Sequence, residues 1–202
     1  MFSLFLKGGL LMWPILLCSI VSFAIILERF WYFYKIKTKI FNIFTRIKNL
    51  LKEGKPDEAL KLCESTPGPI AHILAIGIRI RHRTLEEKEK LISRAGSKFI
   101  RQLEKNLQIL AIIGNIAPLL GLLGTVTGMI RVFMKIQELG GKVDAQALAG
   151  GIWEALITTA AGLFVAIPTL VAYHYFEGKV DNIVAEMKDV ATEVIELQIA
   201  NG

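Results

Sequence analysis

Hydrophobic positions in this chain gather into three long stretches that contain almost no charge. Residues 8–27 and residues 106–130 contain no Lys, Arg, Asp or Glu, and residues 145–176 contain one, Glu154. A helix needs roughly 20 apolar residues to cross a hydrocarbon layer of ~30 Å, so each stretch is long enough. With no strand pattern elsewhere, the chain is predicted to be an all-α membrane protein with three transmembrane helices.

The polar segment between the first two stretches shows the signals of helix starts. Pro56 and Pro69 suit the first turn of a helix, and Thr84 with Glu87 three residues later forms a capping-box pattern. Neither Gly nor Pro lies between residue 97 and the second stretch. One continuous helix is therefore predicted to run from Thr84 into the second span.

The third span is also predicted to continue past the membrane. Apolar residues recur beyond it at alternating steps of four and three, as in a heptad pattern: Phe176, Val180, Ile183, Met187, Val190, Val194 and Leu197. Two interpretations stay open. The helix packs on the chain's own helical domain, or the tails of several subunits line a shared vestibule.

These patterns divide the chain into seven segments. They are a periplasmic N-terminus (1–7), transmembrane helix 1 (8–28), a helical cytoplasmic domain (29–105), transmembrane helix 2 (106–130), a periplasmic loop (131–146), transmembrane helix 3 (147–175) and a cytoplasmic C-terminal helix (176–202).

The charge distribution sets the expected orientation. Residues 29–105 and 177–202 together hold 20 of the 24 Lys and Arg residues. Because basic residues concentrate on the cytoplasmic side, we expect the N-terminus outside the membrane and the C-terminus in the cytoplasm. The net charge of +6 is thus explained by the orientation in the membrane and by contact with anionic lipid. A nucleic-acid partner is not expected.

The composition favours a membrane protein, and the sequence lacks the residue patterns expected of an enzyme. The chain is 53% hydrophobic, with a mean hydropathy of +0.49. Cys18 and Cys63 fall in different environments, so neither a disulfide nor a metal site is expected. The sequence contains no nucleotide-binding loop and no nucleophile–base pair, so we predict a protein that is not an enzyme and has no cofactor.

Small residues form a stripe along the second span. They recur at steps of three and four: Gly114, Ala117, Gly121, Gly124 and Gly128. In lipid, close approach of helix backbones through small residues supplies the packing that hydrophobicity cannot. The stripe therefore predicts either packing within the chain or a seam between subunits.

The third span holds the residues with the clearest chemistry. Placing a charge at a span's centre costs ~2.5–3.5 kcal/mol, and a proton crossing the membrane gains ~2.3 kcal/mol per 100 mV. Because the two energies are comparable, Glu154 is a candidate proton carrier, although a neutral, structurally hydrogen-bonded Glu is the alternative. Thr125, Thr158 and Thr159 would continue a polar path, unless each hydroxyl only bonds its own helix.

At these positions the sequence resembles the MotA/TolQ/ExbB proton-channel family, most closely its ExbB/TolQ branch. Three blocks carry the resemblance across nearly the whole chain: Gly9 to Arg29, Ala117 to Val126, and Gly151 to Pro168. MotA itself has four spans and a larger cytoplasmic insertion, so this chain departs from the flagellar branch.

The resemblance implies a ring, a pentamer, around the spans of ExbD/TolR-like partner chains. Proton flow through such a complex works on a TonB- or TolA-like protein in a Gram-negative inner membrane. Glu154 matches the family's third-span glutamate, and Thr125 and Thr159 match its pore threonines. Thr158 falls where some members have Ala, so it ranks lower. The alternative function is a membrane scaffold that assembles partners without conducting ions.

Overall fold

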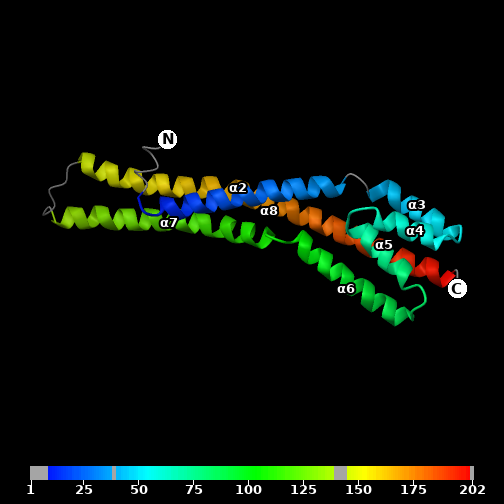
Figure 1. Cartoon of the computed structure of the whole chain (residues 1–202). Coiled ribbons are helices and arrows are strands. Elements are labelled where there is room, and N and C mark those ends of the chain that lie inside the picture. The colour runs from blue at the N-terminus through cyan, green and yellow to red at the C-terminus, as the bar shows by residue number, and fades with distance from the viewer. Residues whose placement is uncertain (1–8, 38–39, 139–144, 201–202) are drawn as a thin grey trace. The chain divides into compact units, whose positions relative to one another are not determined.

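The fold is all-α within the part of the chain that the computed structural model describes, residues 9–37, 40–138 and 145–200, with side chains described except at 36–44, 145–148 and 197–200. The helices are α2 (Met12–Lys37), α3 (Ile40–Lys52), α4 (Pro56–Glu64), α5 (Pro69–Arg79), α6 (Leu85–Leu103), α7 (Leu107–Glu138) and α8 (Ala145–Ala200) (Figure 1).

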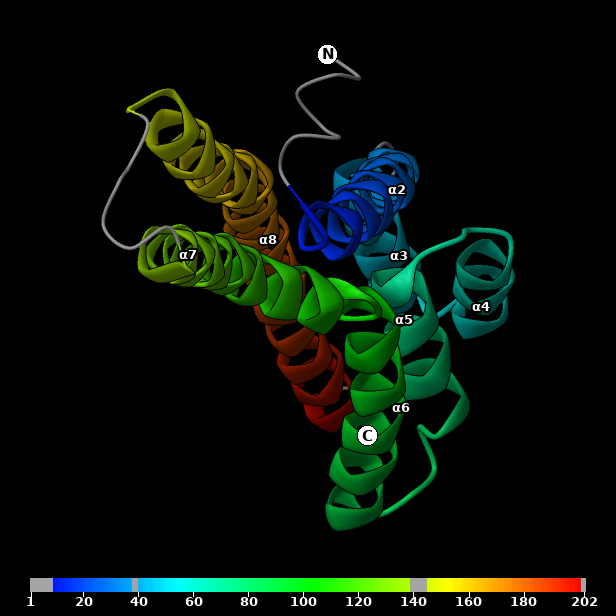
Figure 2. The same ribbon diagram turned by 90° about the vertical axis from the view of Figure 1, so that its left-hand side faces the viewer.

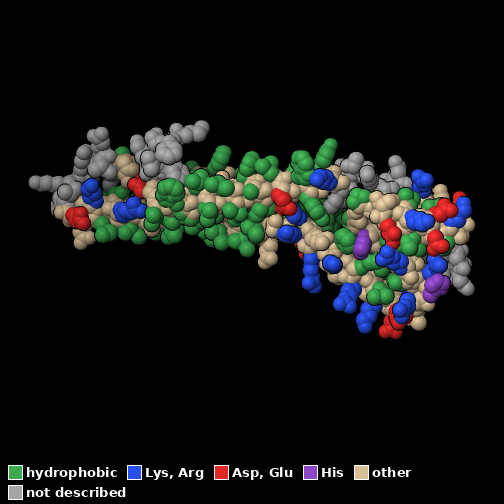
Figure 3. All heavy atoms as spheres, in the orientation of Figure 1, with side chains coloured by type: hydrophobic (Ala, Val, Ile, Leu, Met, Phe, Trp, Pro, Cys, Tyr) green, Lys and Arg blue, Asp and Glu red, His purple; other side chains and the backbone are tan. Residues whose placement is uncertain are grey.

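Three of these helices are long and apolar enough to cross a membrane. The candidate spans are Met12–Lys35 in α2, Leu107–Glu138 in α7 and Ala149–Glu196 in α8. Large apolar side chains project from all three helices, and Figure 3 shows them as a hydrophobic surface. The prediction of an all-α membrane protein with three spans is confirmed.

The chain divides into two compact units. The first, called the span unit below, comprises Met1–Glu28 and Asn106–Tyr175, and the second, called the bundle unit, comprises Arg29–Lys105 and Phe176–Gly202. Lys, Arg, Asp and Glu side chains gather mainly on the bundle unit in Figure 3. α8 is one continuous helix that contributes to both units, as predicted for the third span.

The span unit packs α7 and α8 side by side, with α2 against the pair (Figure 2). Its core consists of Ile15 from α2, Ile113 and Ala117 from α7, and Val165 and Ala166 from α8. The core is narrow because small residues bring the α7 and α8 backbones together. Most large side chains of this unit therefore face outward, as expected of helices surrounded by lipid.

The bundle unit wraps α3, α4, α6 and the far half of α8 around α5. Eight of the eleven residues of α5 are buried, which makes this short apolar helix the centre of the unit. The predicted starts are confirmed, since Pro56 and Pro69 lie in first turns and Thr84 and Glu87 form a capping box.

The heptad residues of α8 pack inside the bundle unit. Phe176, Val180, Met187, Val190 and Val194 are buried, and the Phe176 ring stacks on Phe33 of α2 with centroids 5.6 Å apart. This is the first of the two interpretations, a helix that packs on its own domain. Leu197, the last residue of the pattern, lies outside the described side chains.

Cys63 lies in the interior of the bundle unit. Only 2% of its surface is exposed. This burial, aided by the neighbouring Glu64 carboxylate, raises the thiol's pKa to about 11. Since the thiolate is the reactive form, Cys63 is a slow target for thiol reagents near neutral pH.

The prediction of one uninterrupted helix from Thr84 into the second span is wrong. The chain breaks between α6 and α7, where Asn106 has a left-handed φ of 64°. Asn adopts this conformation more readily than most residues. Its carbonyl then accepts from the N–H groups of Ile109 and Leu110 and starts α7.

Glu28 and Arg29 form hydrogen bonds with the residues on the two sides of this break. The buried Arg29 guanidinium donates to the carbonyls of Gln102 and Leu103 at the end of α6, both at 3.2 Å. The Asn106 amide donates to the Glu28 carboxylate at 3.2 Å. A cation at a helix C-terminus satisfies carbonyls that the helix itself leaves unpaired.

The helices are longer than the predicted spans. α7 continues eight residues past the expected limit of 130, and α8 begins at Ala145 rather than residue 147. Charged residues such as Arg131 and Lys135 end an apolar stretch but remain good helix formers. The predicted N-terminal segment 1–7 and loop residues 139–144 lie outside the described residues.

Candidate functional site

Glu154 lies on α8 and faces the neighbouring helix α7. Its side chain is 33% exposed, and its Oε1 lies 3.1 Å from Nη1 of Arg131, whose side chain is 59% exposed. Arg131 is the only cation within 4 Å of this carboxylate among the described residues. The one carboxylate inside the third span is therefore paired with a guanidinium from the second.

Gly9, near the start of the chain, lies close to the same carboxylate. Gly9 has a φ of +70°, and a Cβ there would stand 2.6 Å from Glu154 Oε1. The left-handed conformation favours glycine at this position. Three segments thus meet at Glu154: the residues before α2, the end of α7 and the first part of α8.

Large apolar side chains are exposed on both helices near the charged pair in sequence. Trp153 and Leu156 on α8 are more than half exposed, as are Ile130 and Phe133 on α7. The charged pair therefore lies on a stretch of both helices that also exposes large apolar side chains.

The three candidate threonines donate their hydroxyls to main-chain carbonyls. Thr158, which is 1% exposed, donates to the Glu154 carbonyl at 2.9 Å, one turn back on α8. Thr159 donates across the helix pair to the Gly121 carbonyl of α7 at 2.8 Å. Thr125 donates to the Leu122 carbonyl within α7 at 2.7 Å. Thr158 and Thr125 thus bond their own helices, whereas Thr159 links α7 to α8.

The small-residue stripe faces α8 of the same chain. A Cβ on Gly121 would stand 2.9 Å from the Thr159 Cα, and one on Gly128 would stand 2.9 Å from the Ala155 Cβ. Gly124 lies against the Thr158 side chain.

The remaining contacts extend the stripe in both directions along α7. Gly114 lies against Leu170. A Cβ on Gly162 of α8 would stand 2.5 Å from the Ala117 carbonyl oxygen, so these two residues are also in close contact. Packing within the chain accounts for all five stripe positions, and a second subunit is not required to explain the pattern.

Arg131 was not among the residues singled out from the sequence, because it was placed in a loop beyond the second span. A usable signal was present in the spacing. Two antiparallel helices joined near residue 141 place residues 128–131 opposite Glu154, and Arg131 is the first charge after the apolar stretch. Gly9 carried no such signal, since its approach to Glu154 depends on tertiary packing.

The described residues contain no group of His, Cys, Asp and Glu side chains suited to hold a metal ion. What the Glu154 site offers is acid–base chemistry. A carboxylate can take up a proton, and the resulting neutral acid attracts the guanidinium beside it much more weakly than the carboxylate does.

Comparison with known proteins gives a consistent family. The model of the MotA/TolQ/ExbB proton channel family matches residues 65–189. The putative biopolymer transport protein ExbB-like 1 of Synechocystis sp. is 35% identical over 174 residues, covering 84% of this chain and 67% of the relative.

Two further relatives have similar coverage. The putative biopolymer transport protein ExbB homolog of Methanothermobacter thermautotrophicus is 32% identical over 181 residues, covering 89% of this chain and 64% of the relative. The biopolymer transport protein exbB1 of Vibrio cholerae is 29% identical over 171 residues, covering 80% and 72%. The chain thus spans about two thirds of the length of the first two relatives.

The family match covers more than half of the chain and includes both helices that carry the Arg131–Glu154 pair. With relatives named ExbB on the same stretch, this chain belongs to the MotA/TolQ/ExbB proton channel family and to its ExbB-like members.

Proposed function

We propose that this chain is the proton-channel subunit of an inner-membrane motor that converts the proton motive force into mechanical work. The observation that carries the proposal is Glu154, the single carboxylate inside the third span, which lies partly exposed between two helices. A carboxyl group at membrane depth is expensive and is generally retained for function.

The energetics suit a reversible proton carrier. The penalty for an ionised side chain in the span, ~2.5–3.5 kcal/mol at the centre, is of the same order as the ~2.3 kcal/mol that 100 mV gives each proton. Glu154 can therefore exchange protons under a physiological driving force. Among the three candidate threonines, Thr159 extends the polar route by linking the two helices, whereas Thr125 and Thr158 bond carbonyls of their own helices.

The chain would work as part of an assembly. By family resemblance we propose a ring of five copies around the single spans of an ExbD/TolR-like partner, which supplies the next carboxylate for the proton. The output would act on a TonB- or TolA-like protein, in keeping with the biopolymer transport that the relatives' names describe. The exposed apolar faces of α2, α7 and α8 leave surface for lipid and for neighbouring copies.

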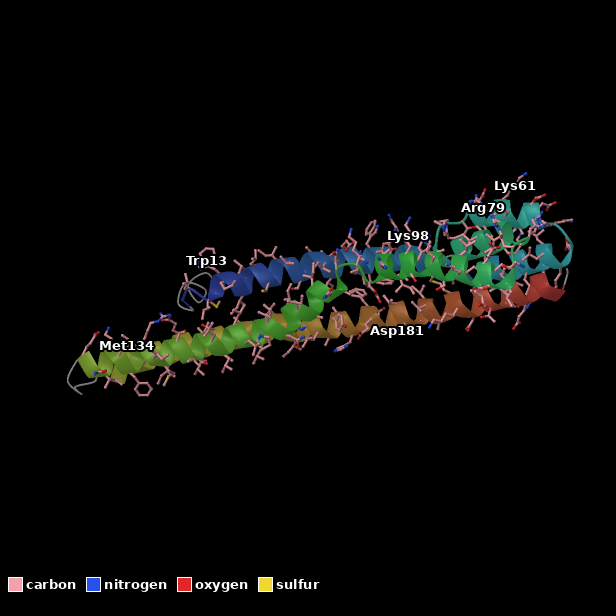
Figure 4. The ribbon with its side chains drawn as sticks, turned by 90° about the horizontal axis from the view of Figure 1, so that it is seen from below. Trp13, Lys61, Arg79, Lys98, Met134 and Asp181 are labelled. Carbon is pink, nitrogen blue, oxygen red and sulfur yellow. The ribbon has the colours of Figure 1, made fainter. Side chains whose placement is uncertain are left out.

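The proposed orientation places the bundle unit in the cytoplasm, because residues 29–105 and 177–202 hold most of the basic residues. The buried Cys63 is a poor reporter of this orientation, whereas Lys61 on the same helix is exposed (Figure 4). Glu138, at the end of α7 one turn after Met134, is exposed on the proposed outer side.

The orientation is tested by adding one cysteine, Lys61→Cys or Glu138→Cys, to a chain in which Cys18 and Cys63 are alanine. In intact spheroplasts a membrane-impermeant maleimide is expected to label Glu138→Cys and to label Lys61→Cys only after permeabilisation. The opposite labelling pattern contradicts the orientation. The parent chain with Cys63 restored controls for burial and is expected to label slowly in both conditions.

The proposed function is tested by proton flux into sealed vesicles under an imposed membrane potential. Vesicles that contain this chain together with an ExbD/TolR-like partner are expected to take up protons, whereas vesicles with either chain alone conduct poorly because one carboxylate is missing. A purified, assembled complex that carries no flux at any potential would favour the non-conducting scaffold.

A further inference from the structure

We propose that Arg131 is a latch on Glu154, which holds the carboxylate while it is charged and releases it when it takes up a proton. The inference rests on the proposed function, since it assigns a residue that controls the same proton site. It makes Arg131 a positioning residue that links the charge of Glu154 to a movement of the Arg131 side chain.

The backbone beneath the pair is fixed, so only the side chains are free to move. On α7, the residue after Arg131 is Val132, which is buried and lies against Gly151 of α8. On α8, the residue after Glu154 is Ala155, which is 2% exposed and lies against Gly128 of α7. Buried contacts on both helices therefore hold the two Cα positions in register, and the ion pair sits at the edge of this interface.

The contact itself is of a kind that opens easily. The structure gives one Nη1–Oε1 contact rather than a two-pronged pair, and both side chains are substantially exposed. Ion pairs with this exposure are weak in general. Loss of charge on one partner is therefore enough to release the other.

No other described cation could replace Arg131 at this position. The described residues of the span unit carry the charged side chains Glu28, Arg131, Lys135, Glu138 and Glu154. Glu28 is bonded to Asn106 at the start of α7. Lys135 and Glu138 lie beyond Arg131 on that helix, and the ion pair of Glu154 is with Arg131. On the other side of Glu154 is the main chain of Gly9, which brings no charge.

The proton step balances without any further reactant. A proton from water adds to a carboxylate oxygen of Glu154, which becomes a neutral acid, and Arg131 keeps its own charge and loses its partner. The freed guanidinium then has donors available for a carboxylate on the partner's span. When Glu154 passes its proton to that carboxylate, Glu154 becomes charged again and Arg131 returns to it.

The latch predicts that Glu154 holds a proton more readily when the Arg131 charge is removed. It also predicts that such a chain leaks more protons when the partner is absent. Arg131→Gln, in the complex with the partner, is expected to raise the protonated fraction of Glu154 at a given pH, seen as the infrared C=O band that Glu154→Gln removes. Proton leak in vesicles lacking the partner is expected to rise about two- to fivefold, the range for an exposed ion pair.

Arg131→Lys and Lys135→Gln are the matched controls. Arg131→Lys keeps the charge and is expected to stay close to wild type in both measurements. Lys135→Gln removes a charge one turn further along α7 and is expected to leave the infrared titration unchanged. If Arg131→Gln and Arg131→Lys give the same titration and leak, the latch is wrong, and this comparison stands even if both variants are less stable.

The two failures are distinguishable. If Glu154→Gln retains full flux, the proposed function fails whatever Arg131 does. If Glu154→Gln is inactive while Arg131→Gln has the wild-type titration and leak, the proton site stands and only the latch is overturned.

Discussion

Replacing Gly121 is expected to disrupt the folded protein itself and not only its assembly. An added Cβ at this position would stand 2.9 Å from the Thr159 Cα and 3.1 Å from the Thr158 carbonyl oxygen. Because these are backbone atoms of a packed helix, they cannot turn aside as the tip of a flexible side chain would. Overpacking of this kind costs ~1–3 kcal/mol. The larger side chain of Gly121→Leu is expected to destabilise the protein more than Gly121→Ala does.

Gly178→Ala is the matched control for this prediction. Gly178 lies inside helix α8, as Gly121 lies inside α7, but a Cβ at Gly178 would meet nothing within 4 Å. Replacing a helical Gly by Ala without a clash gains ~0.5–1 kcal/mol. The unfolding temperature of the purified chain in detergent, followed by circular dichroism, is thus expected to fall for Gly121→Ala. For Gly178→Ala it is expected to stay the same or rise. Equal unfolding temperatures for Gly121→Leu and wild type would contradict the packing of the stripe on α8.

The spans and the caps were predictable because their signals are local. An uncharged stretch long enough to cross the bilayer, a Pro in a first turn and a Thr84–Glu87 capping box each specify a helix from neighbouring residues alone. Glu154 was found for the same reason, since one carboxylate in an apolar stretch stands out without knowledge of its surroundings. The family resemblance then supplied a role for it.

What the sequence did not reveal depends on contacts between distant segments. The break at Asn106 was not predicted because the segment before α7 lacks Gly and Pro, whereas Asn also adopts a left-handed φ. Its bond with Glu28 and the capping of α6 by Arg29 span more than seventy residues. The small-residue stripe left two partners open, and the position of α8 shows the packing within the chain.

The Arg131–Glu154 pair is the clearest example of this limit. Arg131 looked like the first residue of a polar loop, because its charge ended an apolar stretch. In the structure α7 continues through it and presents its guanidinium to α8. A charge at the end of one span and a carboxylate near the start of the next are worth testing as a pair whenever a short connection makes the two spans antiparallel.

Removing the carboxyl group of Glu154 is expected to abolish proton transport while leaving the complex intact. Gln keeps the size of the side chain and is uncharged, as protonated Glu is, but it cannot take up or release a proton. Groups that transfer protons typically contribute 10²–10⁴-fold to a rate, so flux is expected to fall at least ~100-fold. Glu154→Asp retains the carboxyl and is expected to keep part of the flux.

Loss of a threonine hydroxyl is expected to matter less than loss of the carboxyl. Thr125→Val removes a hydroxyl that bonds its own helix, and Thr159→Val removes the one that links α8 to the Gly121 carbonyl. Both variants leave Glu154 able to load and release a proton. They therefore give a graded comparison for the carboxyl variant within the same vesicle preparation.

The most direct test is proton flux into vesicles containing the Glu154→Gln complex with its partner, after native mass spectrometry has verified that the complex is assembled. The predicted result is an assembled complex whose flux falls to the level of vesicles without protein, with Glu154→Asp in between. Wild-type flux through an assembled Glu154→Gln complex would contradict the account, because the proton would then cross without the only carboxyl in the third span.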